Sequence, residues 1–404
     1  MFNAIIRPVH SKSVSDIFIN FSHFLDHFMM LIFAKAAFDA SRYFDLTYDQ
    51  IIVYGAAGFV LFGAMAPVAA QLADRFSRSL LMVVFHFGVG ISAIFASMSQ
   101  DLLQMSGAIA LIGVFAAIYH PVGIAMILKS NKKIGFRLGV NGVFGNMGVA
   151  AAPLLTGILL TVGDWRVCFI VPGVFCIIYG IIFVFALKDE EAHPDETDTK
   201  VKDYFAPNWQ RALAAIALST ASGGFIFGAM TFVVPRYFEI SLTSISNSVA
   251  ITGLLASVVY AIASFSQIVV GWLVDRYSPK KILLFIAIGQ IIFIYLASQY
   301  ENWTLFIMML LAMCFVFGQI PITDTVVSRY VPDTWRGRVL SVKFLLNLCV
   351  GASVLPASGF ILQTGFEMSF LFVLMSVVAI LVALAALVLP KQENKERLDQ
   401  ITAR

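Results

Sequence analysis

The stretch Gly271–Leu284 reads GWLVDRYSPKKILL, and the stretch Ala70–Leu81 reads AQLADRFSRSLL. In both stretches an aspartate precedes an arginine, an aromatic residue and a serine, and these aspartates, Asp74 and Asp275, are 201 residues apart. Further pairs repeat this spacing to within one residue: Arg137 with Arg338, Asn146 with Asn347, and Pro121 with Pro321. Several matches at one offset indicate a duplicated unit about half as long as the chain.

The amino-acid composition places this repeat in a membrane protein. Of the 404 residues, 59% are hydrophobic and 13% are charged, and the mean hydropathy is +0.87. A soluble globular protein has about 45–50% apolar and about 25% charged residues, and its core could not enclose such an excess of apolar side chains. The composition therefore excludes a cytosolic enzyme, a nucleic-acid-binding protein and a secreted disulfide scaffold. It predicts a polytopic helical membrane protein.

A helix crosses a bilayer with about 20 mostly apolar residues. Twelve such runs occur: 15–38, 50–73, 79–98, 102–128, 138–162, 166–187, 210–235, 247–273, 280–298, 303–328, 338–363 and 366–389. The segment 188–209 is polar and acidic, which is typical of a linker. We therefore expect an all-α membrane protein with two pseudo-symmetric six-helix bundles, at 1–187 and 210–389, and a cytoplasmic tail at 390–404.

Basic residues are distributed unevenly between the two sides of the predicted spans. With the N-terminus placed in the cytoplasm, the cytoplasmic loops hold most of them, including Arg75, Arg78, Arg137, Arg276, Lys280, Lys281, Arg329, Arg336 and Arg338. The opposite side holds Arg42, Arg166 and Arg236, with Lys35 near the end of a span. Positive charge stays on the cytoplasmic side of membrane proteins. We therefore expect an inner-membrane protein whose termini and linker are cytoplasmic.

The repeated stretches resemble the signature of the major facilitator superfamily, and the resemblance covers all twelve predicted spans. The second copy carries the signature in Gly271, Asp275, Arg276, Lys280 and Lys281. The first copy keeps Asp74, Arg75 and Arg78, but Ala70 stands where the family has glycine. Arg336 and Arg338 resemble a further basic motif of the family. The resemblance implies a transporter whose two halves alternate between two arrangements.

An aspartate at the cytoplasmic end of a helix can accept hydrogen bonds from a neighbouring helix N-terminus and pair with arginine. Such a contact forms in one arrangement of the halves and breaks in the other. We therefore interpret the two aspartates and the basic residues of these motifs as a gating latch. The alternative is a topology signal that only satisfies the charge rule.

The span 15–38 contains His23, Asp26 and His27 near its middle, in the stretch SHFLDHF. Spacings of three and four residues put these side chains on one face of a helix. Lipid cannot solvate that face, so it must point to a cavity or a partner. We expect Asp26 and its histidine neighbours to take and release a proton, or to bind substrate, as their exposure alternates. The alternative is a static Asp–His pair that holds this helix to a neighbour.

His120 precedes Pro121 within another span, and a proline kink frees a backbone carbonyl there. His120 could complete a metal site with His23, Asp26 and His27, because two histidines four residues apart can hold Zn²⁺ or Fe²⁺. We favour the proton or substrate role and expect no resident metal. Five more polar residues within spans are candidates to line a cavity: Tyr119, Asn146, Gln267, Gln319 and Asn347.

No phosphate-binding loop, zinc motif or catalytic triad occurs in the sequence. We therefore expect neither an enzyme nor an ATP-driven pump, and no cofactor. Either an ion gradient, expected to be that of protons, supplies the energy, or the protein is a passive uniporter. The sequence predicts a monomeric secondary transporter that moves a small polar or anionic molecule by alternating access. The lipid bilayer is its other partner, and no nucleic acid is involved.

The direction of transport rests on a second resemblance. The stretches His23–Phe28 (HFLDHF) and Tyr119–Gly123 (YHPVG) resemble the fosmidomycin-resistance group of proton-coupled exporters. This likeness implies efflux. Two alternatives stay open, namely a proton symporter that imports a metabolite or a metal chelate, and a ferroportin-like exporter of divalent metal.

Overall fold

The structure, a computed structural model, describes residues 12–13, 15–73, 75–128, 134–189 and 205–390. Within these ranges nearly all of the chain is helical, and twelve helical segments are long and apolar enough to cross a membrane. The prediction of an all-α protein with twelve spans is therefore confirmed. Most of the expected linker and tail, 188–209 and 390–404, lies outside the described residues.

Within the described ranges, helices alternate with short connections. The first half contains β1 (Lys12–Ser13), α2 (Asp16–Tyr43), α3 (Tyr48–Ile51), the 3₁₀ helix η1 (Ile52–Gly55), α4 (Ala56–Ala64), α5 (Ala66–Ala73), α6 (Arg78–Ser97), α7 (Leu102–Ala116), α8 (Tyr119–Leu128), α9 (Ile134–Val162), α10 (Trp165–Ala186) and β2 (Lys188–Asp189). The second half contains α11 (Trp209–Ser241), α12 (Val249–Arg276), α13 (Pro279–Gln299), α14 (Asn302–Gly318), α15 (Ile320–Tyr330), α16 (Asp333–Ala352), α17 (Val354–Gln363) and α18 (Met368–Val388). The two short strands pair with each other in antiparallel register.

Four of the spans are broken into separate helices, and a proline lies in the first turn after a break in each of them. These prolines are Pro67 in α5, Pro121 in α8, Pro321 in α15 and Pro356 in α17. Proline lacks a backbone N–H and clashes with the carbonyl one turn earlier, so it interrupts a helix but suits the first turn of the next. The breaks before α8 and α15 therefore occupy equivalent positions in the two halves.

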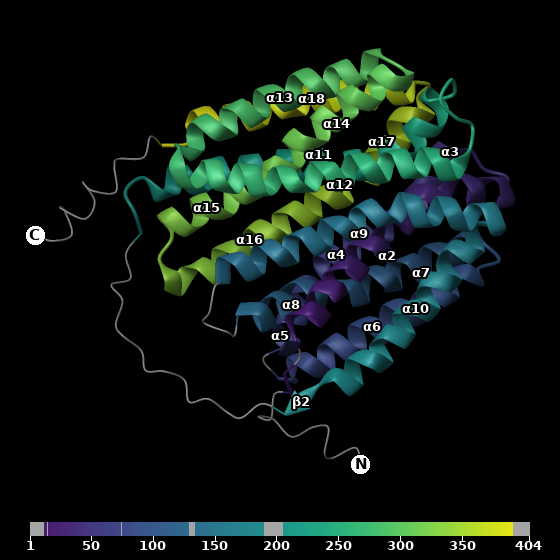
Figure 1. Cartoon of the computed structure of the whole chain (residues 1–404), viewed down its shortest axis with the longest axis horizontal. Coiled ribbons are helices and arrows are strands. Elements are labelled where there is room, and N and C mark those ends of the chain that lie inside the picture. The colour runs from purple at the N-terminus through teal and green to yellow at the C-terminus, as the bar shows by residue number, and fades with distance from the viewer. Residues whose placement is uncertain (1–11, 14, 74, 129–133, 190–204, 391–404) are drawn as a thin grey trace, which may run out of the picture.

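The two halves meet along a long seam. Figure 1 shows the helices of the first half, purple to blue, beside those of the second half, green to yellow. Across the seam α9 packs on α12, α4 on α16, and α2 on α11. At one end of the seam, α17 packs on α3 and η1, and we call this the α3–α17 end.

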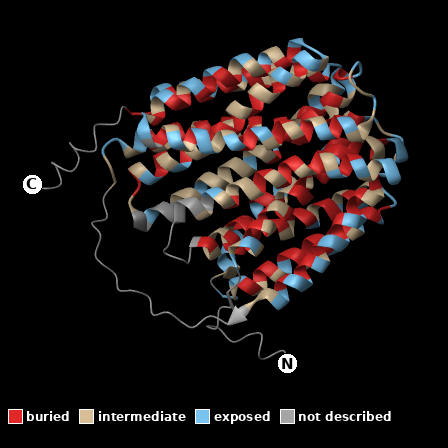
Figure 2. Cartoon of the chain, in the orientation of Figure 1, coloured by how far each residue is buried: buried red, intermediate tan, exposed pale blue. Residues whose placement is uncertain are grey.

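The outer face of the bundle is apolar. Figure 2 shows buried residues between the helices and exposed residues on their outward faces. Large hydrophobic side chains are common among the exposed ones, with Leu103 at 81% and Phe185 at 84% exposure. Water would penalise such a surface, whereas the hydrocarbon core of a bilayer accommodates it. The exposure pattern is thus that of a membrane protein.

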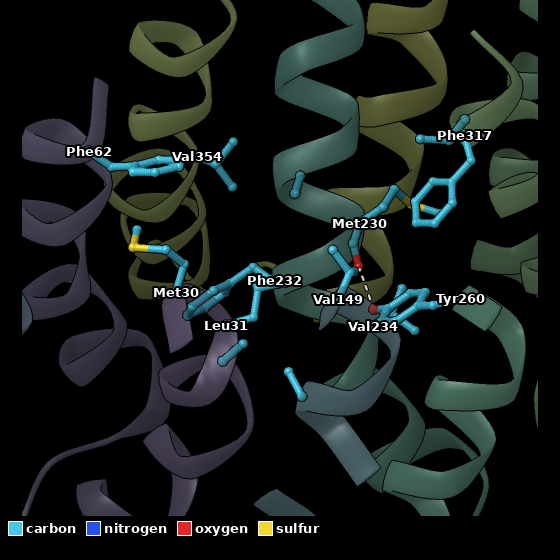
Figure 3. Packing of buried hydrophobic residues seen from close by; sticks show 14 of the residues in the cluster. Met30, Leu31, Phe62, Val149, Met230, Phe232, Val234, Tyr260, Phe317 and Val354 are labelled. Carbon is cyan, nitrogen blue, oxygen red and sulfur yellow. Dashed lines mark hydrogen bonds between the residues drawn. The ribbon is translucent and has the colours of Figure 1, made fainter. Parts of the chain in front are cut away.

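Apolar side chains from both halves fill the seam. Figure 3 shows Met30 of α2 beside Phe232 of α11, and Phe62 of α4 facing Val354 of α17. All four side chains are buried. Without a hydrophobic driving force inside a bilayer, helices associate through close packing and a small number of polar contacts. The seam is therefore mostly an apolar packing interface, in which a charged contact is an exception.

The first span is longer than the sequence indicates. The helix α2 continues to Tyr43, five residues beyond the predicted end at residue 38. Lys35 therefore lies inside the helix and is only 2% exposed, which shows that its expected place near a helix end was wrong. The helix can bury this lysine because a carboxylate from the other half neutralises it within the protein.

Gly113 of α7 allows close approach to Gly58 of α4. A Cβ atom on Gly113 would lie 2.0 Å from the carbonyl oxygen of Gly58, so Gly113→Ala forces the two helices apart. We expect this substitution to lower the free energy of unfolding by about 1–3 kcal/mol, the usual cost of overpacking, measured as a lower Tm in detergent. Gly107→Ala on the same helix is the control, since nothing lies within 4 Å of its Cβ. Equal destabilisation by both would contradict this role.

Candidate functional site

The candidate site forms where α2, α8 and α9 meet. The helix α2 supplies His23, Asp26 and His27, and α8 supplies His120 in its first turn. The Asp26 side chain is fully buried, and His23 and His120 are less than a tenth exposed. The structure therefore brings together the four residues that the sequence singled out for proton, substrate or metal binding.

Hydrogen bonds define the protonation of two of the rings when both are neutral. The Nδ1 atom of His23 lies 2.8 Å from the backbone carbonyl oxygen of Asn141 on α9. A carbonyl only accepts, so Nδ1 of His23 donates and its Nε2 is left as an acceptor. The Nε2 atom of His27 lies 3.1 Å from that Nε2 and must be the donor. The two imidazoles thus form a short hydrogen-bonded relay.

The carboxylate of Asp26 has an unusual environment. Its Oδ2 atom lies 3.4 Å from Nε2 of His120, but the two groups are not aligned as a hydrogen bond, and neither Asp26 oxygen has a hydrogen-bond donor among the described residues. An ionised carboxylate without donors is costly to bury. Asp26 is therefore a group whose charge the surrounding protein does little to stabilise in this arrangement.

The three histidines also lie close enough to share one ion. One ring nitrogen from each of His23, His27 and His120 lies within 4.8 Å of the other two. Imidazole nitrogen is a common ligand of transition metals, and a carboxylate often completes such a set. The geometry thus fits either a proton carrier or a cation ligand set.

Two asparagines that the sequence reasoning missed support this cluster. The Nδ2 atom of Asn141 donates to Oδ1 of Asn20 at 3.0 Å and to the Tyr119 hydroxyl at 2.7 Å. Tyr119 donates in turn to the carbonyl of Ile19 and stacks on the His23 ring, with ring centroids 4.6 Å apart. Tyr119 therefore positions His23. The sequence did offer a signal for Asn141, because this polar residue lies within the glycine-rich stretch of α9.

The cluster lies at the seam. The ring of His120 packs on Phe344 of α16, with centroids 4.2 Å apart, and on Phe62 of α4 at 5.7 Å. Phe344 belongs to the other half of the chain, and nothing in the sequence pattern marked it. Any rearrangement of the two halves must therefore change the cover over His120.

The cavity candidates of the second half form a different structure. Gln319 donates to the backbone carbonyl and the hydroxyl of Ser219 at 2.9 and 3.0 Å, and it accepts from Gln290 at 2.8 Å. These bonds tie the break between α14 and α15 to α11 and α13. Gln319 is thus placed in a neutral network within its own half rather than near Asp26.

The remaining cavity candidates are dispersed. Asn347 of α16 packs against α11, with its Oδ1 2.4 Å from where a Cβ on Gly224 would sit. Gln267 of α12 is half-buried, and its Nε2 has no hydrogen-bond partner among the described residues. Asn146 is buried on α9, five residues beyond Asn141. Among the described residues, none of these three side chains has a hydrogen bond to the histidine cluster.

Three described residues of the gating motifs contact helix ends or a neighbouring side chain within their own half. Arg78 lies 3.4 Å from the carbonyl of Ala125, Lys280 donates to the carbonyls of Leu387 and Leu389, and Arg276 stacks on Trp272. Arg75 is exposed, and a Cβ on Gly271 would meet open space. The side chains of Asp74, Asp275, Arg336 and Arg338 lie outside the described residues, so the latch stays a prediction.

Asp324 of α15 is paired across helices, although Arg329 lies little more than one turn away on its own helix. It forms an ion pair with Lys343 of α16, while Arg329 donates to the carbonyl of Val274 at 2.7 Å. The packing of α16 on α15 brings Lys343 within reach, which spacing along one helix could not reveal.

The fold and the repeated motifs agree with a comparison of the whole sequence with known families. The profile described as Major Facilitator Superfamily matches residues 17–246 and 238–403. The chain belongs to the Major Facilitator Superfamily. The resemblance inferred from the repeated motifs is therefore confirmed, and this facilitator is a multi-pass membrane transporter.

Curated relatives of this facilitator include proteins named for drug resistance. It is 26% identical over 289 residues to "Multidrug resistance protein MdtG" of Proteus mirabilis (strain HI4320), an alignment that covers 70% of this chain and 71% of that protein. It is 26% identical over 235 residues to the protein of the same name in Escherichia coli (strain SMS-3-5 / SECEC), covering 55% and 56%. The chain thus aligns with little more than half the length of the Escherichia coli relative.

Solved structures of transporters share the fold. A bacterial homolog of the human lysosomal transporter Spinster has a TM-score of 0.72 and 16% identity, covering 93% of this chain and 95% of that chain. A D-xylose-proton symporter has a TM-score of 0.74 and 12% identity, covering 93% and 96%. At these identities the likeness concerns the fold alone.

Gly145 of α9 makes room for the His23 ring. A Cβ on Gly145 would lie 2.6 Å from that ring, so Gly145→Ala displaces His23 from Tyr119 and from the Asn141 carbonyl. We expect this variant to fold but to lose most transport, measured in proteoliposomes alongside its Tm. Gly142→Ala on the same helix is the control, since nothing lies within 4 Å of its Cβ. Normal transport by Gly145→Ala would show that the position of His23 does not matter.

Proposed function

We propose that this facilitator exports a small polar or anionic organic molecule from the cytoplasm in exchange for protons, and that Asp26 is the coupling residue. The observation that supports this most directly is the Asp26 carboxyl group, fully buried without a hydrogen-bond donor. Such a group favours the protonated form while enclosed and the ionised form once hydrated. Coupling requires a difference of this kind between two conformations.

The position of the cluster supports the same role. Phe344, from the other half, covers His120, and His120 lies beside Asp26. Separation of the halves removes that cover and admits water. The hydrogen-bonded rings of His23 and His27 offer a path by which a proton leaves or enters.

The asymmetry of the halves supports placing the coupling in the first half. The first half carries His120 at the break before α8, next to an aspartate, whereas the second half carries Gln319 at the equivalent break before α15, in a neutral amide network. Amides do not titrate, so the second half can supply polar contacts but no proton carrier there.

The direction of transport and the orientation of the protein in the membrane have separate support. The relatives named for multidrug resistance support efflux. The charge bias of the loops supports an inner-membrane protein with both termini in the cytoplasm, so that the α3–α17 end faces outward. The protein acts as a monomer, is not an enzyme, and uses the proton gradient without a cofactor.

Metal export is the second candidate, because three histidine nitrogens lie within 4.8 Å of one another beside a carboxylate. In that case the cluster would bind its cargo rather than a proton. A proton symporter that imports a metabolite would use the same coupling residue in the opposite direction. Proton-coupled transport and metal export predict different effects of Asp26→Asn and of the histidine variants on transport and binding.

Asp26→Asn removes the carboxyl proton while keeping the size of the side chain. We expect this variant to lose accumulation or efflux driven by a pH gradient but to keep substrate exchange, because binding does not require the proton to move. The substrate is first selected from a panel of small organic anions by thermal shift, since a ligand stabilises the state it binds. Transport is then measured in proteoliposomes with and without a pH gradient.

The exposed Asp45 provides the matched control, since Asp45→Asn makes the same chemical change outside the cluster. Concentration of substrate by Asp26→Asn at the wild-type rate would disprove the coupling role. For metal export, Zn²⁺ alone should raise the Tm of the wild type, and His27→Ala should abolish that shift. Absence of any Zn²⁺ shift in the wild type would remove the metal candidate.

A further inference from the structure

A buried charged cluster crosses the seam far from the histidines. Lys35 of α2 is 2% exposed, and its Nζ atom lies 2.5 Å from Oε1 of Glu239 on α11. The same Nζ donates to the hydroxyl of Thr252 on α12 at 3.1 Å. Lys35 belongs to the first half of the chain, and both of its partners belong to the second. This lysine therefore joins the halves through an ion pair and a hydrogen bond.

Glu239 also has a cation on its own helix. The Nη1 atom of Arg236, one turn earlier on α11, lies 2.7 Å from Oε2 of Glu239. The guanidinium of Arg236 stacks on the ring of Phe38, 3.3 Å from its centroid, and Phe38 lies one turn beyond Lys35 on α2. One carboxylate is therefore shared by two cations, one from each half, and the second cation makes its own contact across the seam.

Neighbouring helices bury most of this cluster: the Lys35 side chain is fully buried, while those of Glu239 and Arg236 are 10% and 16% exposed. A Cβ on Gly253 would lie 2.2 Å from the carbonyl of Pro153 and 3.5 Å from Cε of Lys35, so α9 and α12 pack closely beside the lysine. At the same end Gln363 of α17 donates to the carbonyl of Asp49 on α3 at 3.2 Å. The charged cluster thus lies at the α3–α17 end of the seam, where the two halves are in contact.

We propose that Glu239 is a gating residue for transport, whose shared carboxylate holds the α3–α17 end closed by pairing with Lys35 and releases Lys35 when that end opens. The pair spans the halves, so it exists only while they touch. The pair Glu239–Arg236 stays within one helix, so Glu239 remains neutralised after the halves part. Water then solvates Lys35. This inference needs only that the chain alternates between two states, and it stands whether or not Asp26 couples protons.

The shared carboxylate predicts unequal effects of removing each partner. Glu239→Gln leaves Lys35 and Arg236 as two adjacent cations in a largely buried seam, which strongly disfavours the closed end. Lys35→Met leaves Glu239 paired with Arg236, so it disfavours the closed end only slightly. Adding Lys35→Met to Glu239→Gln removes the repulsion between the two cations and should restore part of the closed population.

The test measures the separation of the halves directly. Spin labels on cysteines at Gln50 of α3 and Phe360 of α17, in the full-length protein with its native cysteines replaced, report the opening of this end by pulsed electron spin resonance. We expect Glu239→Gln to raise the ratio of open to closed protein about tenfold and Lys35→Met about twofold, with the double variant in between. Glu239→Asp, which keeps the charge, should stay close to the wild type.

Asp164→Asn is the matched control, since Asp164 pairs with Arg166 within the first half at the same end and should not change the distances. A distance distribution for Glu239→Gln equal to the wild type would overturn the proposal. So would a larger opening by Lys35→Met than by Glu239→Gln. If Glu239→Gln does not fold, the remaining variants (Lys35→Met, Glu239→Asp and the double variant) test the proposal. If Glu239 paired with Lys35 alone, Lys35→Met by itself would open this end fully, which would contradict a carboxylate shared with Arg236.

Discussion

The hydrocarbon core of a bilayer offers no hydrogen-bond partner, and this constraint accounts for most of the structure. Every backbone polar group in a span must bond within its own helix, so the chain folds as helices. Every polar side chain must find a partner inside the protein. Asn141 does so with Asn20 and Tyr119, and Gln319 does so with Ser219 and Gln290. Polar groups that lack such partners, above all Asp26, are the exceptions that point to function.

The same constraint explains why two charged groupings at the seam have different characters. In the first, Asp26 and three histidines crowd together with too few donors for the carboxylate. In the second, Lys35, Glu239 and Arg236 form short contacts that satisfy each charge. An unsatisfied cluster is suited to exchange a proton or a ligand, whereas a satisfied one is suited to hold a position. Both lie where the halves meet, so both change when the halves move.

The duplicated architecture carries unlike chemistry in its two halves. Breaks at equivalent prolines, Pro121 and Pro321, interrupt one span of each half. The first break presents His120, and the second presents a glutamine network. The repeat therefore specifies the shape of the bundle twice, while the side chains at equivalent positions have diverged. A proton carrier in one half and a neutral framework in the other is a consistent division of roles for one transported molecule between them.

The sequence by itself determined the class of protein, the twelve spans and the family, because hydropathy and charge bias act locally and the motif repeats at one fixed offset. It also determined that His23, Asp26 and His27 share a face, because that follows from the pitch of a single helix. The tertiary structure alone decided that His120 joins them, that Phe344 covers them, that Asp324 pairs with Lys343, and that Lys35 meets Glu239. Each of these contacts links different helices, and no periodicity along the chain encodes which faces of two separate helices pack together.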